Sequence, residues 1–297
     1  MHNPYAIRIE AVRGCTQRCP FCSLSAMDWK DEPFKFMDFG MFQHACNELS
    51  TWLPKHRMEW AERGEPTMHP KLIDMVAYAR QTLPKAQLTI TTNGDKQLSK
   101  QINFREYVLE LFQAGANIIM LDCYWQERYD EMTAMFPEAK DFFADEIHPY
   151  TYRNPKYKEI IIVDATPGKS NTIRWYQNQG GTVDIQMAAR AGFEIPIVTE
   201  PLQKMCVKPF RELSLHWDGT VPICCNDWLD VAVAGRFPDV SLEELWFGET
   251  GLNRFRRPLL NKDRAALSPC DKCSERSGFR VGLEMNWFGD RQPKKDT

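Results

Sequence analysis

The sequence predicts an α/β protein: a partial, TIM-like (β/α)6 barrel followed by a small α+β module that contains a β-hairpin and a helix. Short β-rich runs alternate with longer helical patterns up to residue 163, as expected for βαβ units around a parallel sheet. These repeats number about five or six, fewer than the eight that close a full barrel. The pattern changes near residue 201, so we expect two domains, residues 1–200 and 201–297.

The barrel elements follow one another in regular order. The predicted strands cover residues 6–12, 57–61, 87–92, 117–124 and 159–163, and the predicted helices cover 41–53, 70–82, 104–114 and 126–136. In the second domain, residues 212–216 and 221–225 flank an Asp-Gly pair, which predicts a two-residue hairpin turn. Short helices are expected over 242–247 and 252–260.

Composition narrows the class of protein. The 297 residues carry a net charge of -3, which gives no general attraction to a polyanion, so a nucleic-acid partner is not favoured. The chain has ten cysteines, but its N-terminal residues do not resemble a signal peptide. We therefore expect the protein to lie in a reducing cytoplasm rather than to carry disulfides. No apolar run has the length of a bilayer span, so no membrane association is expected.

Three cysteines near the start carry the strongest chemical signal: Cys15, Cys19 and Cys22 in the run GCTQRCPFC. A loop with this spacing can direct three thiolates at one point, which is how proteins hold iron-sulfur clusters. A fourth iron would then lack a protein ligand and could bind a small molecule, so the triad indicates redox chemistry. Zinc is the alternative, but no nearby His or Cys is placed to be its fourth ligand.

Two further motifs follow predicted strands. Gly64-Glu65-Pro66 comes after the second strand, and Thr91-Thr92-Asn93-Gly94 ends the third. Together with the cysteine loop, in this order, they resemble the radical S-adenosylmethionine (SAM) superfamily over residues 6–122. One departure is Arg63, which stands where the superfamily usually has a second glycine.

The resemblance implies specific roles for these residues. Cys15, Cys19 and Cys22 would hold a [4Fe-4S] cluster, and SAM would chelate the open iron. The implied SAM contacts are Phe21 beside the adenine, Gly64, Glu65 and Pro66 at the ammonium group, Thr92 and Asn93 at the ribose or carboxylate, and Asp122 at the ribose.

A second set of cysteines lies in the C-terminal region: Cys206, Cys224, Cys270 and Cys273. Four thiolates can enclose one cluster or one zinc ion, and the residues alone leave both open. With the N-terminal motifs present, the set resembles the SPASM and twitch extensions of radical SAM enzymes, which implies an auxiliary [4Fe-4S] cluster. Cys224 and Cys225 are adjacent, and the spacing from Gly219 favours Cys224.

The resemblance implies an enzyme that reductively cleaves SAM to a 5′-deoxyadenosyl radical and takes a hydrogen atom from its substrate. The auxiliary cluster would complete a two-electron oxidation of a small polar molecule or a peptide. The cysteine spacing resembles that of the aminocyclitol dehydrogenase type, and an external donor such as flavodoxin or ferredoxin is implied. The alternatives are radical SAM modification of a nucleotide or nucleic-acid base, and a noncatalytic zinc-binding interaction module.

No catalytic base is identified from the sequence. Arg174, Arg190, Glu200 and His216 lie near the domain junction, and each is more typical of a structural residue. Residues 142–181 are expected to shape the substrate pocket. Within them, Asn178-Gln179-Gly180-Gly181 partly resembles an Asn-Arg-Gly-Gly element of some relatives.

Overall fold

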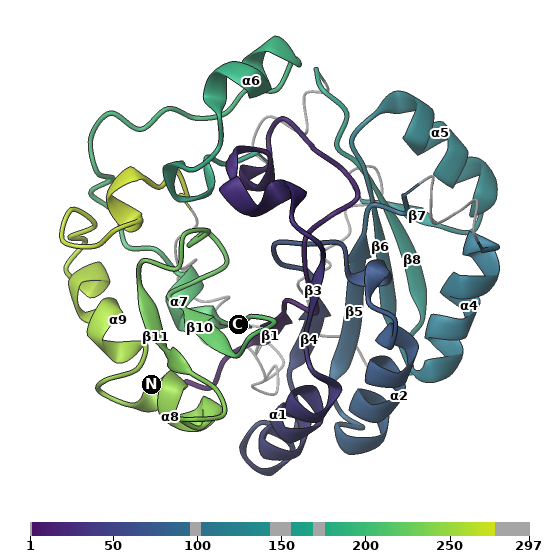
Figure 1. The fold of residues 1–297 in the computed structure, drawn as a ribbon, viewed down its shortest axis with the longest axis horizontal. Helices are drawn as coiled ribbons and strands as arrows, with labels where there is room; N and C mark the ends of the chain where they lie inside the picture. The colour runs from purple at the N-terminus through teal and green to yellow at the C-terminus, as the bar shows by residue number, and fades with distance from the viewer. Residues whose placement is uncertain (1, 96–101, 143–155, 169–175, 277–297) are drawn as a thin grey trace, which may run out of the picture.

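A computed structural model describes residues 2–95, 102–142, 156–168 and 176–276 of the chain (Figure 1). The main sheet has seven parallel strands in the order β7-β8-β6-β5-β4-β1-β9. They are β1 (Ala6–Ile9), β4 (Arg57–Trp60), β5 (Gln87–Thr92), β6 (Ile118–Cys123), β7 (Lys140–Asp141), β8 (Glu159–Asp164) and β9 (Glu212–Leu215). The predicted α/β class and partial barrel are confirmed.

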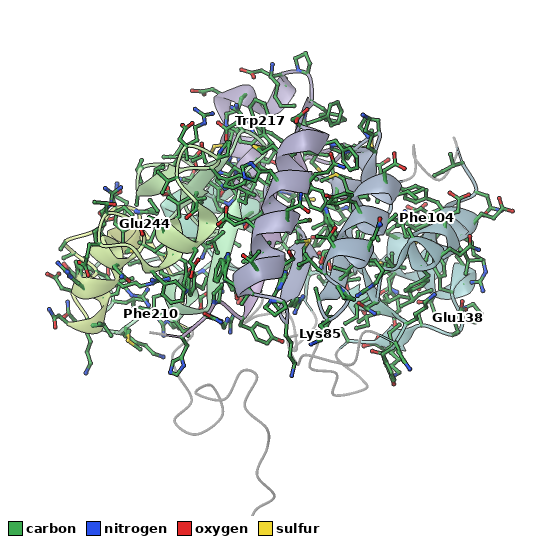
Figure 2. All side chains as sticks on the ribbon, turned by 90° about the horizontal axis from the view of Figure 1, so that it is seen from below. Lys85, Phe104, Glu138, Phe210, Trp217 and Glu244 are labelled. Atoms are coloured by element: carbon green, nitrogen blue, oxygen red, sulfur yellow. The ribbon has the colours of Figure 1, made fainter. Side chains whose placement is uncertain are left out.

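The helices between these strands cover the outer face of the sheet. They are α1 (Phe39–Trp52), α2 (Leu72–Thr82), α4 (Phe104–Ala114) and α5 (Gln126–Met135). Asp38 caps α1 by accepting a hydrogen bond from Met41 N, and Asn103 caps α4 in the same way. Figure 2 shows α1 and α2 side by side, with Phe104 and Glu138 on the opposite side of the molecule from Phe210 and Glu244.

Alternation along the strands separates the two faces of the sheet. The outward side chains are apolar and pack under the helices; they include Ile7, Ile9, Met58, Trp60, Leu88, Ile90, Ile119 and Leu121. The inward positions differ between strands: β1, β4 and β5 present Arg8, Glu59 and Thr91, whereas β6 and β8 present mainly the apolar Met120, Ile161 and Val163, with Asp122 at the end of β6. The barrel interior therefore has a polar half and an apolar half.

The C-terminal elements are α7 (Lys208–Arg211), β10 (Thr220–Pro222), β11 (Val233–Arg236), α8 (Leu242–Phe247) and α9 (Asn253–Leu260). The predicted pairing of 212–216 with 221–225 is wrong. β9 instead pairs in parallel with β1, and β10 pairs antiparallel with β11. The reason is that β1 offers a free edge, where Leu213 and Leu215 of β9 join the main core.

The predicted turn between these two segments does form. His216 N donates to the carbonyl of Thr220 at 2.9 Å, and Gly219 has a φ of +89°. The predicted strand over 6–12 is also interrupted, because Val12 and Arg13 leave the sheet as β2 (Val12–Arg13) and pair with β3 (Lys35–Phe36). A last helix, α6 (Ile185–Arg190), precedes the C-terminal region. Within the described ranges no helix has the length and apolarity of a membrane span.

Candidate functional site

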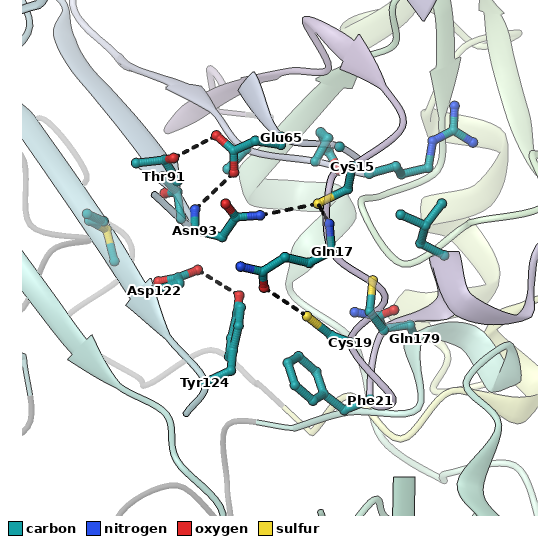
Figure 3. Close-up of a pocket in the computed structure, with 18 of the residues that line it drawn as sticks. Cys15, Gln17, Cys19, Phe21, Glu65, Thr91, Asn93, Asp122, Tyr124 and Gln179 are labelled. Atoms are coloured by element: carbon teal, nitrogen blue, oxygen red, sulfur yellow. Dashed lines mark hydrogen bonds between the residues drawn. The ribbon is translucent and has the colours of Figure 1, made fainter. Parts of the chain in front are cut away.

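A cavity of about 300 Å³ opens at the carboxyl ends of β1, β4, β5 and β6 (Figure 3). This is the edge at which parallel barrels bind their ligands. The residues predicted for the N-terminal site that line it are Cys15, Cys19, Phe21, Cys22, Gly64, Glu65, Thr92, Asn93 and Asp122. Pro66 does not line the cavity, because it begins a short 3-10 turn (Pro66–Met68) behind Glu65.

The cysteine loop places three thiols along one wall of the cavity. Burial, with the charge of Glu65 adding to it, raises the pKa of Cys15 to about 12, and burial raises the pKa of Cys22 to about 11. Thiolates at these positions therefore need positive charge beside them, and the irons of a cluster supply it. The donor set fits an iron-sulfur cluster.

A single zinc ion suits the cysteines less well. Zinc holds its sulfur ligands about 2.3 Å from one point. Among the residues that the structure describes, no three His, Cys, Asp or Glu side chains are placed to hold one metal ion in this way. An iron-sulfur cluster is larger and binds its thiolates at separate corners, so it fits more widely spaced sulfurs.

Gly64 allows the backbone of the Gly-Glu motif to pack directly against the backbone that leads into the cysteine loop. Its backbone runs so close to the loop that an added Cβ would lie 2.0 Å from the carbonyl oxygen of Val12 and 2.6 Å from that of Gly14. The next residue, Glu65, donates its N–H to Gly14 O at 3.0 Å. Only glycine permits this approach.

The buried carboxylate of Glu65 joins the ends of β4 and β5. Oε1 accepts hydrogen bonds from the N–H and hydroxyl of Thr67 and from the hydroxyl of Thr92 at 2.6 Å. Oε2 accepts from Asn93 N at 2.9 Å. Burial raises the pKa of Glu65, and these hydrogen bonds oppose the rise. Oε2 accepts one bond here, so it keeps a second acceptor position for a ligand.

Asp122 ends β6 beside a group of aromatic rings. Its Oδ2 accepts a hydrogen bond from the Tyr124 hydroxyl at 3.0 Å, while its buried Oδ1 has no hydrogen-bond partner among the residues that the structure describes. Burial raises the pKa of Asp122 to about 7. The centroid of the Phe21 ring lies 4.7 Å from those of Tyr124 and Tyr176 and 4.6 Å from that of Phe193. A flat heterocycle with hydroxyl groups fits this pairing of aromatic surface and open acceptor.

Four cysteines of the C-terminal region come together in a second, buried site. Cys206, Cys224 and Cys270 share one small apolar core, and Cys273 lies at the end of the 3-10 turn that begins at Cys270. Burial and the neighbouring thiols of Cys225, Cys270, Cys206 and Cys273 raise the pKa of Cys224. Cys225 points elsewhere, because its Sγ lies 3.4 Å from Nζ of Lys208.

A short segment, residues 177–182, links the two cysteine sites. Gln179 Oε1 accepts a hydrogen bond from Ser23 N, next to Cys22, at 2.8 Å. Asn178 donates to Lys272 O at 2.6 Å and accepts from Ser274 N at 2.8 Å, on either side of Cys273. Gln179 also lines the cavity. The rest of the predicted pocket region includes 143–155 and 169–175, which lie outside the described residues.

Sequence reasoning missed the charged side of the cavity. Arg8, Glu59 and Glu62 line one wall of the cavity. Nε of Arg8 donates to Glu62 Oε1 at 3.2 Å, and Nη1 of Arg8 lies 3.6 Å from Glu59 Oε2. Charged residues at the inward positions of otherwise apolar strands were the available signal. Of the four residues considered as bases, Arg174 lies outside the described residues, and the other three do not line the cavity.

Comparison with known proteins agrees with this geometry. Residues 206–274 match the SPASM family, an iron-sulfur cluster-binding domain. No curated protein matches the chain. The crystal structure of BtrN in complex with AdoMet and 2-DOIA is similar to the chain, with 19% identity, a TM-score of 0.65 and coverage of 92% of this chain and 94% of that one.

Two other solved structures share the fold. BtrN in an open conformation has 16% identity and a TM-score of 0.59 over 92% of this chain and 94% of that one. The structure of anSMEcpe with bound AdoMet has 13% identity and a TM-score of 0.53, covering 86% and 84%. These findings agree with the resemblance that the motifs predict: residues 206–274 match the SPASM iron-sulfur cluster-binding domain, and the chain shares the fold of the BtrN and anSMEcpe structures.

Proposed function

We propose that this protein is a radical SAM enzyme that oxidises a small polar molecule or a peptide by two electrons. The observation that carries the proposal is that one cavity is lined by three cysteines, by the ends of β4 and β5 that Glu65 joins, and by the Phe21 and Asp122 side chains. Each wall offers what one part of a cluster-bound SAM requires.

The chain's own residues have distinct tasks in this proposal. Cys15, Cys19 and Cys22 would hold the SAM-binding [4Fe-4S] cluster, and Cys206, Cys224, Cys270 and Cys273 the auxiliary one. When bound, SAM and the two clusters supply a 5′-deoxyadenosyl radical and an acceptor for the second electron. The remaining residues orient SAM.

The SAM contacts follow from the unused hydrogen-bonding positions. Oε2 of Glu65 accepts from the ammonium group of SAM. Oδ1 of Asp122 accepts from a ribose hydroxyl, and Phe21 packs beside the adenine. The aromatic group around Phe21 excludes water from this end of the cavity.

The polar half of the barrel indicates the substrate class. Arg8, Glu59 and Glu62 offer donors and acceptors to a molecule rich in hydroxyl or amino groups. The similar BtrN structure contains AdoMet and 2-DOIA, which supports a small-molecule substrate. The electron donor would be external, such as flavodoxin or ferredoxin. No observation favours a nucleotide or nucleic-acid substrate, and the SPASM match disfavours the zinc module.

Anaerobic purification tests the proposal directly. The protein should be brown and contain about eight iron atoms, as two four-iron clusters require. With SAM and dithionite it should form 5′-deoxyadenosine, measured by liquid chromatography and mass spectrometry. Cys19→Ala should abolish this product, whereas Cys46→Ala, on the buried face of α1, should keep it. A colourless zinc protein, or no 5′-deoxyadenosine from an iron-replete protein, would reject the function.

A further inference from the structure

We propose that Arg63 is a positioning residue that holds Trp228, from the SPASM domain, as a wall of the SAM cavity. This inference rests on the proposed function, because it concerns the same cavity. Arg63 is the residue that stands in place of the second glycine expected from the superfamily. The structure gives that departure a physical role.

The Arg63 guanidinium is buried and joins two parts of the chain. Nε and Nη2 donate to the two carboxylate oxygens of Glu10 at 2.9 and 3.0 Å, in a bidentate pair. Nη1 donates to Asp230 Oδ2 at 2.9 Å and to the carbonyl oxygen of Trp228 at 3.3 Å. Nη2 also donates to Nδ1 of His216 at 2.8 Å. Arg63 therefore connects the end of β1 to the loop that carries Trp228.

Among the described residues, Trp228 is the one from the SPASM region that lines the cavity. It is 4% exposed and forms a small buried cluster with Leu24 and Met27, against which Cys15 and Cys22 of the N-terminal loop pack. It also stacks on Trp29, with ring centroids 6.3 Å apart and planes 8° apart. Movement of Trp228 would open the cavity beside the cysteines.

Beyond the Trp228 ring itself, the next three residues of the loop have little apolar anchoring. Leu229 and Val231 are 60% and 53% exposed, and Asp230 has a φ of +51°. Asp227 also holds the loop by accepting from the N–H groups of Val231 and Ala232, and Oδ1 of Asp230 lies 3.2 Å from Nδ1 of His216. The bidentate pair with Glu10 fixes the guanidinium, and its charge-assisted bond to Asp230 is stronger than a neutral hydrogen bond, so Arg63 restrains the loop that carries the ring. A glycine at position 63 makes none of these contacts.

Fluorine NMR of protein labelled with 5-fluorotryptophan tests the placement of Trp228. Trp228→Phe assigns the signal. In Arg63→Met we expect that signal to move toward the shift of free 5-fluorotryptophan, because the ring leaves its packed site. Arg105→Met is the matched control, since it removes a guanidinium that pairs with Glu138 on the surface and should leave the signal in place. An unchanged Trp228 signal in folded Arg63→Met protein overturns the inference.

Two milder variants keep the test decisive where Arg63→Met does not fold. Asp230→Asn weakens one contact and keeps the pair with Glu10, and Arg63→Lys keeps the charge without the bidentate geometry. Both should shift the Trp228 signal in the same direction by a smaller amount, and no shift in either overturns the inference. The NMR signal does not require SAM cleavage. A wild-type protein that forms no 5′-deoxyadenosine would therefore defeat the proposed function while leaving this test intact.

Discussion

The side-chain amide of Asn93 lies 3.3 Å from Sγ of Cys15, so the end of β5 donates a hydrogen bond to the cysteine loop (Figure 3). Asn93 is held there by its backbone N–H, which donates to Glu65. One residue thus touches both the proposed cluster ligand and the proposed SAM contact.

Asn93→Ala should lower the reduction potential of the N-terminal cluster. A hydrogen bond to a ligating sulfur stabilises the reduced, more negative cluster, so its loss disfavours reduction. A redox titration followed by electron paramagnetic resonance measures the potential. Asn47→Ala is the control, because Asn47 accepts a hydrogen bond from Tyr78 on the surface. Equal potentials in wild type and Asn93→Ala would contradict the predicted contact.

The pair of adjacent cysteines allows a matched comparison. Cys224→Ala should lose the auxiliary cluster and reduce the iron content from about eight to about four atoms. Cys225→Ala should keep all of the iron, because its thiol faces Lys208. Iron and sulfide assays on both anaerobic proteins decide this, and the reverse result would assign Cys225 as the ligand.

Glu65→Gln should weaken SAM binding by about tenfold or more, since a hydrogen bond to a charged group contributes roughly 1.5–3 kcal/mol. The substitution removes the charge that would receive the ammonium group. It also cannot present acceptors at both Oε1 and Oε2, where four hydrogen bonds now arrive. Equilibrium dialysis with labelled SAM measures the affinity. Glu138→Gln, on the surface with Arg105, should bind SAM normally.

His56 should make the protein less stable in mild acid. The ring is buried, Nδ1 contacts Leu53 O at 2.6 Å, and in the described part of the chain Nε2 finds no hydrogen-bond partner. Burial lowers the pKa of His56 from 6.5 to about 4, and the Leu53 contact opposes the shift. In the unfolded chain His56 is therefore protonated below about pH 6.5, whereas in the folded protein it is protonated only below about pH 4.

The contribution of His56 is complete above pH 6.5 and is lost as the pH falls toward 4. By pH 5.5 the loss amounts to about 1 kcal/mol. Urea unfolding at pH 7.5 and 5.5 measures it as a difference in the free energy of unfolding. His56→Gln should show a smaller decrease between these two conditions than wild type, whereas the exposed His44→Gln should match wild type. An identical decrease in all three proteins would refute the assignment.

The strands and helices of the barrel could be predicted because each depends on near neighbours. Alternating apolar residues such as Ile7, Ile9, Leu88 and Ile90 indicate strands without reference to distant parts of the chain. Asp38 and Asn103 cap their own helices through contacts three residues away. The pairing of β9 could not be predicted in this way. The Asp218-Gly219 turn forms as expected, but the free edge of β1 competes for β9, and that edge lies about 200 residues earlier in the chain.

The same division applies to the site. The spacing of Cys15, Cys19 and Cys22 and the order of the motifs were enough to predict an iron-sulfur site, because three thiolates at short separations along one loop can reach one cluster. Tertiary structure alone decided that Arg63 reaches Trp228, that Cys225 turns to Lys208, and that residues 177–182 join the two cysteine sites. These contacts connect residues that lie far apart in the chain, so they exist only once the sheet has brought its edges together.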